Sequence, residues 1–337
     1  MNSLERIAAT IEFRDTDRAP VIAQLFGHAA ALAGVSMDDY VRHGKTLARC
    51  QLDALKRYGY DAVFSVMDVN VETEAVGSVL RYRENQYPVI ERYALSLESD
   101  WNGLPLPDPQ RAGRMPEMLK ALGILRREFE NEVLVVGCVL GPFTLTTQLL
   151  GLETALYLAI DDSPRLEQLM DFATEVIIRF GQAQLQSGAH LPVVFDPSAS
   201  PAVIPPRLFR EFELPRLQRV FQAFMGAGAV ANWLHIAGPV SSILPYYPKA
   251  GVHIANFDYG VSALDAMNEL PTTCLDGNIK SLTFVDGSPA DIEAEALKLL
   301  RIFRGRGGFI LSSGCEIPPE SSPENIAAMV RAAGVVR

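Results

Sequence analysis

Short apolar segments alternate with longer segments of helical periodicity along the chain. Eight of the short segments are mostly apolar on both faces, which is typical of strands buried in a parallel sheet. They cover residues 20–26, 61–66, 134–139, 191–195, 231–236, 252–257, 272–275 and 308–311. The pattern therefore predicts an α/β fold with eight strands.

Three of the intervening segments begin with a Ser-Pro pair, in which the serine hydroxyl can cap the helix and the proline takes its first position. The pairs are Ser163-Pro164, Ser288-Pro289 and Ser322-Pro323. After Pro164, apolar residues recur at intervals of three and four as far as Phe180, and Gly188 can end the helix in a left-handed conformation. We expect this segment to form a helix on the outside of the sheet.

Eight strands that alternate with helices predict a closed (β/α)8 barrel, or TIM barrel, rather than an open sheet. No GxGxxG motif follows the first strand, as it would in a Rossmann domain. Residues 78–82 and 89–94 flank the turn Glu84-Asn85-Gln86 and predict a β-hairpin inserted after the second strand, near the barrel mouth. The Pro- and Gly-rich residues 100–114 are interpreted as a surface loop, so one domain over residues 1–337 is expected.

The composition narrows the class of protein. Of 337 residues, 48% are hydrophobic and 21% are charged, which is enough apolar material for a large core. The net charge is -10 and the basic residues are scattered, so we expect no nucleic-acid partner. A charged N-terminus and apolar runs well below about 18 residues predict neither a secretory signal nor a membrane span. Four widely spaced cysteines suit a reducing cytoplasm.

In a barrel of this kind the active site lies at the carboxyl ends of the strands, so polar residues after the apolar segments are candidates. A histidine, a thiol and several carboxylates are predicted to meet at this rim. The candidates are Asp68, Asn70, Thr144, Asp196, His235, Asp258, Asp276, Asn278, Cys315 and Glu316. Substrate binding is assigned to Phe26, Asp68, Asn70, Thr144, Asp258 and Asn278.

Several longer stretches carry a family resemblance. They are Asp17-Arg18-Ala19-Pro20-Val21, GPFTLTTQLLG from Gly141, Asp196-Pro197-Ser198-Ala199-Ser200, LHIAG from Leu234, DGNI from Asp276 and FILSSGCEIPPESSPENI from Phe309. In order and spacing the chain resembles the uroporphyrinogen decarboxylase superfamily, and within it the methylcobamide:coenzyme M methyltransferase branch. The resemblance implies methyl transfer between a methylcobamide, carried by a small corrinoid-binding partner protein, and a thiol or folate acceptor at the barrel mouth.

The same resemblance implies a zinc ion that activates the accepting thiol, because zinc lowers thiol pKa. Members of the branch bind it through a His-x-Cys pair after the fifth strand and a Cys after the eighth. The matching positions here are His235, Ala237 and Cys315, so the middle ligand is replaced. A carboxylate is then needed as a third ligand, and the candidates are Glu72, Glu74, Asp68 and Asp258. We assign zinc binding to His235, Cys315 and Glu74, and catalytic roles to His235, Cys315 and Asp196.

Two other functions remain open at this point. Uroporphyrinogen decarboxylases carry an Arg-rich MRQAGR loop after the first strand, which holds substrate carboxylates, whereas residues 22–28 here contain no arginine. A carboxy-lyase of this kind is therefore the second interpretation. A non-catalytic ligand-binding barrel, suggested by Ala237, is the third. A homodimer is also left open.

Some candidates have a purely structural alternative. Asp196-Pro197 can form a turn and helix cap, and Gly141-Pro142 can form a tight strand-to-helix turn. His190 and His253 precede or begin strands, at the end of the barrel opposite the expected site, and are interpreted as structural. Cys315 is the cysteine that we expect to take part in chemistry.

Overall fold

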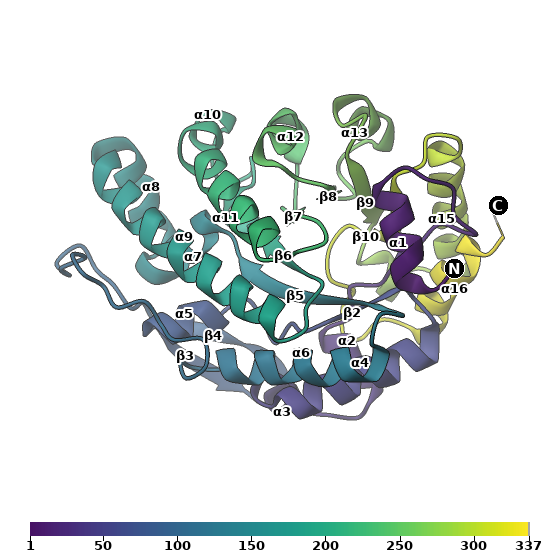
Figure 1. Cartoon of the computed structure of the whole chain (residues 1–337), viewed down its shortest axis with the longest axis horizontal. Helices are drawn as coiled ribbons and strands as arrows, with labels where there is room; N and C mark the ends of the chain where they lie inside the picture. Colours follow the sequence, from purple (N-terminus) through teal and green to yellow (C-terminus); the bar gives the residue numbers. More distant parts are fainter. Residues whose placement is uncertain (336–337) are drawn as a thin grey trace.

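The computed structural model describes residues 1–335, so the last two residues of the expected domain 1–337 lie outside the described part. Eight parallel strands form a nearly closed barrel with helices around it, and both termini lie on the same side of the molecule (Figure 1). The barrel strands are β1 (Val21–Ile22), β2 (Ala62–Phe64), β5 (Leu134–Leu140), β6 (Leu191–Phe195), β7 (Trp233–His235), β8 (Ile254–Asn256), β9 (Cys274–Ile279) and β10 (Phe309–Ser313). The predicted (β/α)8 barrel is confirmed.

Helices connect the strands and cover the barrel from outside, as right-handed crossovers require. The longest is α9, which packs a buried row from Leu166 to Phe180 against the barrel, as its periodicity predicts. The α-helices are α1 (Ser3–Ile11), α2 (Gly27–Leu32), α3 (Met37–Arg42), α4 (Gly44–Tyr58), α5 (Val71–Val76), α6 (Met115–Phe129), α7 (Pro142–Leu150), α8 (Leu152–Asp161), α9 (Ser163–Gln186), α10 (Pro206–Leu208), α11 (Leu214–Gly226), α12 (Tyr247–Ala250), α13 (Ala263–Glu269), α14 (Thr283–Asp286), α15 (Pro289–Phe303) and α16 (Pro323–Ala333).

The strands follow one another around the barrel in the order β1-β10-β9-β8-β7-β6-β5-β2. Every residue of the eight strands is buried, because one face lines the barrel interior and the other packs under the helices. At the remaining gap between β1 and β2, the backbone N–H of Asp61 donates to the carbonyl of Val21 at 2.8 Å. This single bond begins the closure of the barrel.

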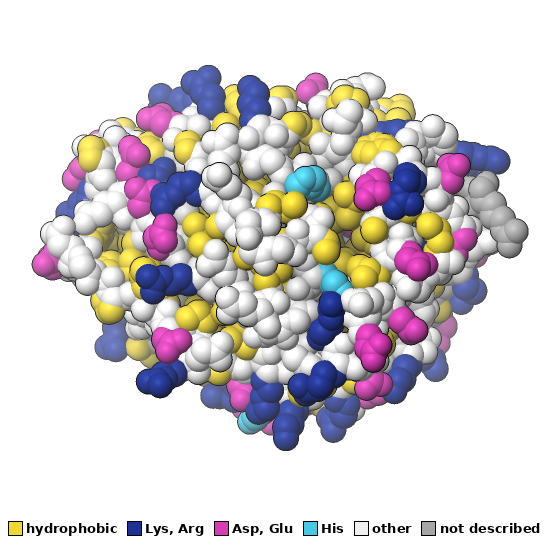
Figure 2. Space-filling view, in the orientation of Figure 1, with side chains coloured by type: hydrophobic (Ala, Val, Ile, Leu, Met, Phe, Trp, Pro, Cys, Tyr) yellow, Lys and Arg dark blue, Asp and Glu magenta, His cyan; other side chains and the backbone are white. Residues whose placement is uncertain are grey.

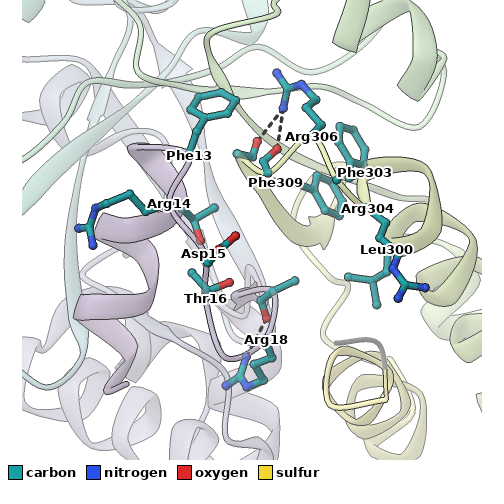
Figure 3. A pocket seen from close by; sticks show the side chains of 15 residues that line it. Phe13, Arg14, Asp15, Thr16, Arg18, Leu300, Phe303, Arg304, Arg306 and Phe309 are labelled. Atoms are coloured by element: carbon teal, nitrogen blue, oxygen red, sulfur yellow. Dashed lines mark hydrogen bonds between the residues drawn. The ribbon is translucent and has the colours of Figure 1, made fainter.

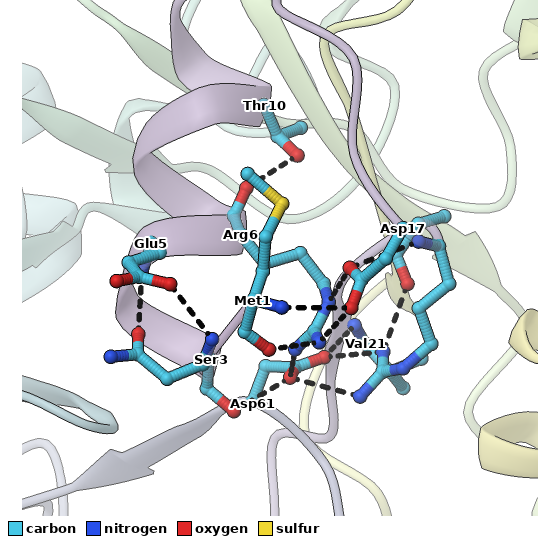
Figure 4. A network of polar contacts seen from close by, with 11 residues as sticks. Met1, Ser3, Glu5, Arg6, Thr10, Asp17, Val21 and Asp61 are labelled. Atoms are coloured by element: carbon cyan, nitrogen blue, oxygen red, sulfur yellow. Dashed lines mark hydrogen bonds and ion pairs between the residues drawn. The ribbon is translucent and has the colours of Figure 1, made fainter.

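The side chain of Asp61 completes that closure (Figure 4). It is fully buried and accepts hydrogen bonds from the Ser3 hydroxyl (2.8 Å), the Arg6 guanidinium (2.7 Å) and the backbone N–H of Val21 (2.7 Å). Arg18 donates a further pair of bonds, at 2.7 and 3.0 Å. A buried carboxylate satisfied by so many donors ties the N-terminal helix to the first two strands.

The first stretch of the family resemblance, residues 17–21, therefore has a structural role. Asp17 accepts two bonds from Arg6, at 2.7 and 2.8 Å, and these bonds hold the pKa of its carboxyl well below the ordinary range. Residues 17–21 lie next to the amino ends of the strands, at the end of the barrel opposite the rim candidates. They stabilise the fold and do not line the candidate site described below.

The predicted hairpin is confirmed as β3 (Val79–Arg83) and β4 (Gln86–Arg92), with the turn at residues 84–85. It follows α5 and lies over the rim. Asn70 donates to the carbonyl of Pro88 at 2.9 Å, and the Tyr87 hydroxyl donates to Glu316 at 2.5 Å. These bonds bring one strand of the hairpin to the carboxyl ends of the barrel strands.

Several predicted boundaries differ from the structure. β9 extends to Ile279 and β10 to Ser313, because their backbones pair as far as Ser312 with Asn278 and Ser313 with Ile279. Asp276 and Asn278 are therefore strand residues rather than loop residues. The polar side chain of Asp276 is tolerated inside the barrel because Asn256 donates to it at 3.1 Å.

The three Ser-Pro pairs have three different outcomes. Ser288 caps α15 and forms a reciprocal capping box with Asp291, as predicted. Ser322 occupies the cap position of α16, but its hydroxyl donates to Glu324 at 2.8 Å instead of capping the backbone. The cap of α9 is Asp162, so Ser163 is already the first helical residue.

Charged side chains lie mainly around the edge of the face seen in Figure 2, and its centre carries mainly uncharged side chains. Basic side chains predominate along the lower edge, and both signs are mixed at the left and right edges. In residues 1–335, no single helix has the length and apolar composition required to cross a membrane. The pair α7 and α8 meets these criteria only jointly, and it bends by 109°.

A cavity of about 290 Å³ lies at the amino end of the barrel, between residues 10–19 and 300–309. Four arginines line it, but they do not converge: Arg14 and Arg306 are directed away from each other (Figure 3). Arg306 donates to the carbonyls of Gly307, Gly308, Leu270 and Thr273, so its guanidinium is occupied by backbone. In barrels of this kind, residues at the amino ends of the strands contribute to stability, and the active site lies at the opposite end. None of the predicted site residues lines this cavity.

Candidate functional site

A second cavity, of about 200 Å³, opens at the carboxyl ends of the strands. Its walls are mostly apolar or aromatic. It is lined by Gln24, Phe26, Val66, Asp68, Val69, Asn70, Tyr87, Pro88, Phe195, Pro197, His235, Ala237, Cys315 and Glu316. The structure thus brings together six predicted rim residues from four separate regions of the chain: Phe26, Asp68, Asn70, His235, Cys315 and Glu316.

The imidazole of His235, at the end of β7, forms part of the cavity wall. It is 2% exposed, and its ring packs edge-on against Phe195, with the centroids 4.7 Å apart. Nδ1 lies 3.5 Å from the amide nitrogen of Gln24. Burial lowers the pKa of His235 from 6.5 to about 3, so the ring is neutral at physiological pH.

Cys315 follows β10, also lines the cavity and is partly exposed. Burial raises the pKa of its thiol to about 11, and the nearby carboxylates of Glu316 and Asp258 act in the same direction. The thiol is therefore protonated at neutral pH. Glu316 itself accepts from the backbone N–H of Gly27 at 3.0 Å and from the Tyr87 hydroxyl at 2.5 Å.

Asp68 lines the cavity and belongs to a network of ion pairs with Arg114 and Glu74. Arg114, only 7% exposed, donates to both carboxylate oxygens of Asp68 and, at 2.6 Å, to Glu74. Glu74 also accepts from the Tyr82 hydroxyl at 2.8 Å. The structure does not bring Glu74 to the cavity, because Arg114 and Tyr82 hold its carboxylate elsewhere.

Asp196 directly follows β6, and Thr144 lies in α7. Their side chains bind each other, and neither residue lines the cavity. Asp196 is fully buried and accepts from the backbone N–H (2.8 Å) and hydroxyl (2.5 Å) of Thr144. Burial raises the pKa of Asp196 and of its neighbour Glu213, and the charge of Asp196 raises that of Glu213 further. The charge on one carboxyl therefore favours the protonated form of the other. Asp196 thereby supports the start of α7.

Asp258 and Asn278 form a second supporting pair. Asp258 accepts from the backbone N–H of Gly238 and of Tyr259, both at 2.7 Å. Asn278 donates to the carbonyls of Asp258 and Val261, at 3.1 and 2.9 Å. Neither residue lines the cavity. Their hydrogen bonds hold the loops that follow β7 and β8 at the rim.

Sequence reasoning missed several lining residues. Gln24 lies within residues 22–28, where no local pattern marks it as a lining residue, and Glu316 was predicted at the rim without a role. Tyr87 comes from the hairpin, where nothing in the local pattern marks an inward-facing aromatic. The signal that could have found it was the predicted place of the hairpin at the barrel mouth.

The donor set was tested against the zinc ion that the resemblance implies. Structural and catalytic zinc sites use at least three protein ligands. His235 and Cys315 share the cavity, but position 237 offers only a methyl group. The carboxylates of Asp68 and Asp258 are already bound to Arg114 and to backbone N–H groups.

The remaining carboxylate candidates do not complete the set. Glu72 accepts from the backbone N–H of Leu140 at 2.8 Å, and burial raises its pKa to about 7. Glu74 is held by Arg114. Within the described chain, no three His, Cys, Asp or Glu residues are arranged to hold a metal ion. The described residues therefore do not fit zinc.

Comparison with known proteins places the chain in a family. The family model described as uroporphyrinogen decarboxylase (URO-D) matches residues 2–335. The chain belongs to the URO-D family. The expected superfamily is thus confirmed.

Individual URO-D relatives include methyltransferases and decarboxylases. The methylcobamide:CoM methyltransferase MtaA of Methanosarcina barkeri is 28% identical over 335 residues, covering 97% of this chain and 96% of that protein. A uroporphyrinogen decarboxylase of Syntrophotalea carbinolica is 28% identical over 293 residues, covering 84% of this chain and 82% of that protein. The solved methyltransferase of Methanosarcina mazei superposes with a TM-score of 0.91 at 27% identity, covering 99% of this chain and 98% of that chain.

Proposed function

We propose that this URO-D protein transfers a methyl group between a corrinoid, carried by a separate small protein, and a small molecule bound in the rim cavity. The observation that carries the proposal is a small apolar cavity at the rim of a chain that matches MtaA, a methylcobamide methyltransferase by name, over almost its whole length. Under this proposal His235 and Cys315 contact the small molecule, and Asp196 supports the rim.

The cavity suits a displacement reaction at a methyl carbon. Such a transfer needs the nucleophile, methyl carbon and leaving atom in line, and it is favoured when water is kept from the reacting atoms. The walls at Phe26, Val66 and Phe195 are buried and apolar, whereas Val69 is 41% exposed at the edge. The buried walls would position the small molecule, and the open edge would admit the corrinoid from the partner protein.

Decarboxylation of uroporphyrinogen is less well supported by the geometry. That tetrapyrrole carries eight carboxylates, which call for arginine forks. Among the residues that line the cavity in the described chain, none is Arg or Lys, and nearby Arg114 is bound to Asp68 and Glu74. The volume of about 200 Å³ is also below the roughly 300–1,000 Å³ of pockets for drug-sized ligands.

The proposal is tested by mixing the purified protein with methylcobalamin and a panel of thiols and tetrahydrofolate, and with cob(I)alamin and a panel of methylated compounds. Transfer in either direction changes the visible spectrum of cobalamin. Ala237→Leu, which adds bulk inside the cavity, should abolish the change, whereas Ala290→Leu on the exposed face of α15 should not. A protein that shows no transfer in either direction, but converts uroporphyrinogen to coproporphyrinogen, would contradict the proposal.

A further inference from the structure

The charged side chains of the rim cavity are two carboxylates, and the protein already binds both. Arg114 donates to both oxygens of Asp68, and Asn70 donates its backbone N–H to the same carboxylate at 2.8 Å. Glu316 accepts from Gly27 and Tyr87. An anionic ligand would find no cation among the described lining residues, and a cationic ligand would compete with bonds that Glu316 already makes.

The uncharged part of the lining is dominated by aromatic and aliphatic surface. Phe26 packs edge-on against Phe195, with centroids 6.2 Å apart, and both rings lie in the wall of the cavity. Val66 and Pro88 extend the apolar surface toward the rim. Apolar walls of this kind favour a ligand that loses little hydration on entry.

One polar atom in the wall lacks a partner. Gln24 is 1% exposed, and its side-chain carbonyl Oε1 accepts no hydrogen bond within the described chain. Its amide nitrogen faces His235 at 3.5 Å, a long contact. A buried acceptor without a donor is costly, so a ligand that donates one hydrogen bond at this point would be favoured.

We infer that the rim cavity is a zinc-free site for a small, uncharged and mainly apolar molecule that donates a hydrogen bond to Gln24. The inference deepens the proposed function and rests on it in one respect only: this molecule would be the methyl donor or acceptor. The zinc-free character follows from the donor set, in which Ala237 replaces a ligand and each candidate carboxylate is held by other groups. It does not depend on which way the methyl group moves.

A charge series of similar ring compounds tests the ligand class by binding alone. Benzyl alcohol, benzoate and benzylammonium are titrated into the full-length protein at pH 7 and followed by ligand-observed NMR. We expect benzyl alcohol to bind at least ~10-fold more tightly than either ion. Ala237→Leu should abolish its binding, and Ala290→Leu should leave it unchanged.

Each other result of the series overturns the inference. Binding of benzoate or benzylammonium as tight as that of benzyl alcohol would show a charged site. No binding by any of the three, or binding unaffected by Ala237→Leu, would show that the cavity is not the ligand site. Because turnover is not measured, a failure of methyl transfer and a failure of this inference remain distinguishable.

Metal content tests the zinc-free part independently. The wild type and Ala237→Cys are incubated with zinc, passed through gel filtration and analysed for bound metal. We expect the wild type to retain far less than one equivalent, and Ala237→Cys to retain close to one, because it restores a third ligand beside His235 and Cys315. A wild type that holds one equivalent, and loses it in Cys315→Ala, would overturn the inference.

Discussion

The side-chain amide nitrogen of Gln24 lies 3.5 Å from Nδ1 of His235, so the loop after β1 meets the end of β7 in the wall of the rim cavity. These residues are 211 positions apart in the chain. The contact exists only because the barrel closes, and it places a neutral imidazole and an amide with a free carbonyl on one apolar surface. Burial shifts the pKa of His235, and this shift can be tested through the pH dependence of the protein's stability.

Replacement of His235 should change how stability depends on pH. Burial lowers the pKa of its imidazole from 6.5 to about 3, so the unfolded chain takes up the proton more readily than the folded protein. The associated stability is complete above about pH 6.5 and is lost as the pH falls toward 3, by at most about 1.4 kcal/mol per pH unit. His235→Gln should flatten the fall in melting temperature between pH 6.5 and 5.

The matched control is His43→Gln, since His43 is exposed on the surface. Its melting temperature should follow that of the wild type across the same range. If His235→Gln and the wild type lose stability in parallel as the solution is acidified, the imidazole is not held neutral by burial, and the description of the cavity wall fails.

Asp276 should contribute to the pH dependence of stability with the opposite sign. It is fully buried in β9, and burial raises the pKa of its carboxyl from 3.8 to about 7. The folded protein therefore binds this proton more tightly, and the stability gained is present below about pH 4 and lost as the pH rises through 7. Asp276→Asn should gain melting temperature relative to the wild type above pH 7. The melting temperature of the surface variant Asp286→Asn should change with pH in parallel with that of the wild type. If Asp276→Asn also runs parallel to the wild type, the raised pKa of Asp276 is refuted.

Gly141 should tolerate no side chain. A methyl group there would lie 2.2 Å from the carboxylate of Asp196, which must stay in place to accept from Thr144. We expect Gly141→Ala to lower the free energy of unfolding by about 1–3 kcal/mol. Gly226→Ala, at the end of α11 with open space around it, should instead be neutral or raise it by about 0.4–1 kcal/mol. Chemical denaturation of both variants measures the difference, and equal effects would contradict the packing at the β5–α7 turn.

Loss of the Arg114 guanidinium should be far more damaging than loss of a surface arginine. Arg114→Met leaves the carboxylates of Asp68 and Glu74 without their cation, and removing one partner of a buried ion pair costs about 3–5 kcal/mol. Arg111→Met removes only an exposed pair with Asp108 at 3.7 Å, so it should stay within about 0.5 kcal/mol of the wild type. Similar unfolding free energies for the two variants would show that the network does not stabilise the rim.

The barrel could be predicted from sequence because its signal is repeated. Each of the eight strands buries both faces, and such segments remain apolar enough to be recognised singly. The prediction failed where a strand carries polar residues, as in β9, whose Asp276 and Asn278 form internal hydrogen bonds. That the whole chain forms one domain stays a prediction.

The candidate site could be predicted only in part, because position after a strand does not fix the direction of a side chain. His235 and Cys315 line the cavity, whereas Asp196 does not line it and accepts two bonds from Thr144. Glu74 was expected beside His235, but Arg114 holds its carboxylate. Gln24 and Tyr87 were missed since their place in the wall depends on closure of the barrel and on the docking of the hairpin, and neither is encoded locally.

Transfer of a labelled methyl group tests the central claim most directly. The protein is incubated with methylcobalamin carrying a deuterated methyl group and the acceptor panel, or with labelled methyl compounds and cob(I)alamin, and the products are identified by mass spectrometry. The account predicts labelled product with the wild type and Ala290→Leu, and none with Ala237→Leu. Labelled product from Ala237→Leu at the wild-type rate, or none from the wild type in either direction, would contradict it.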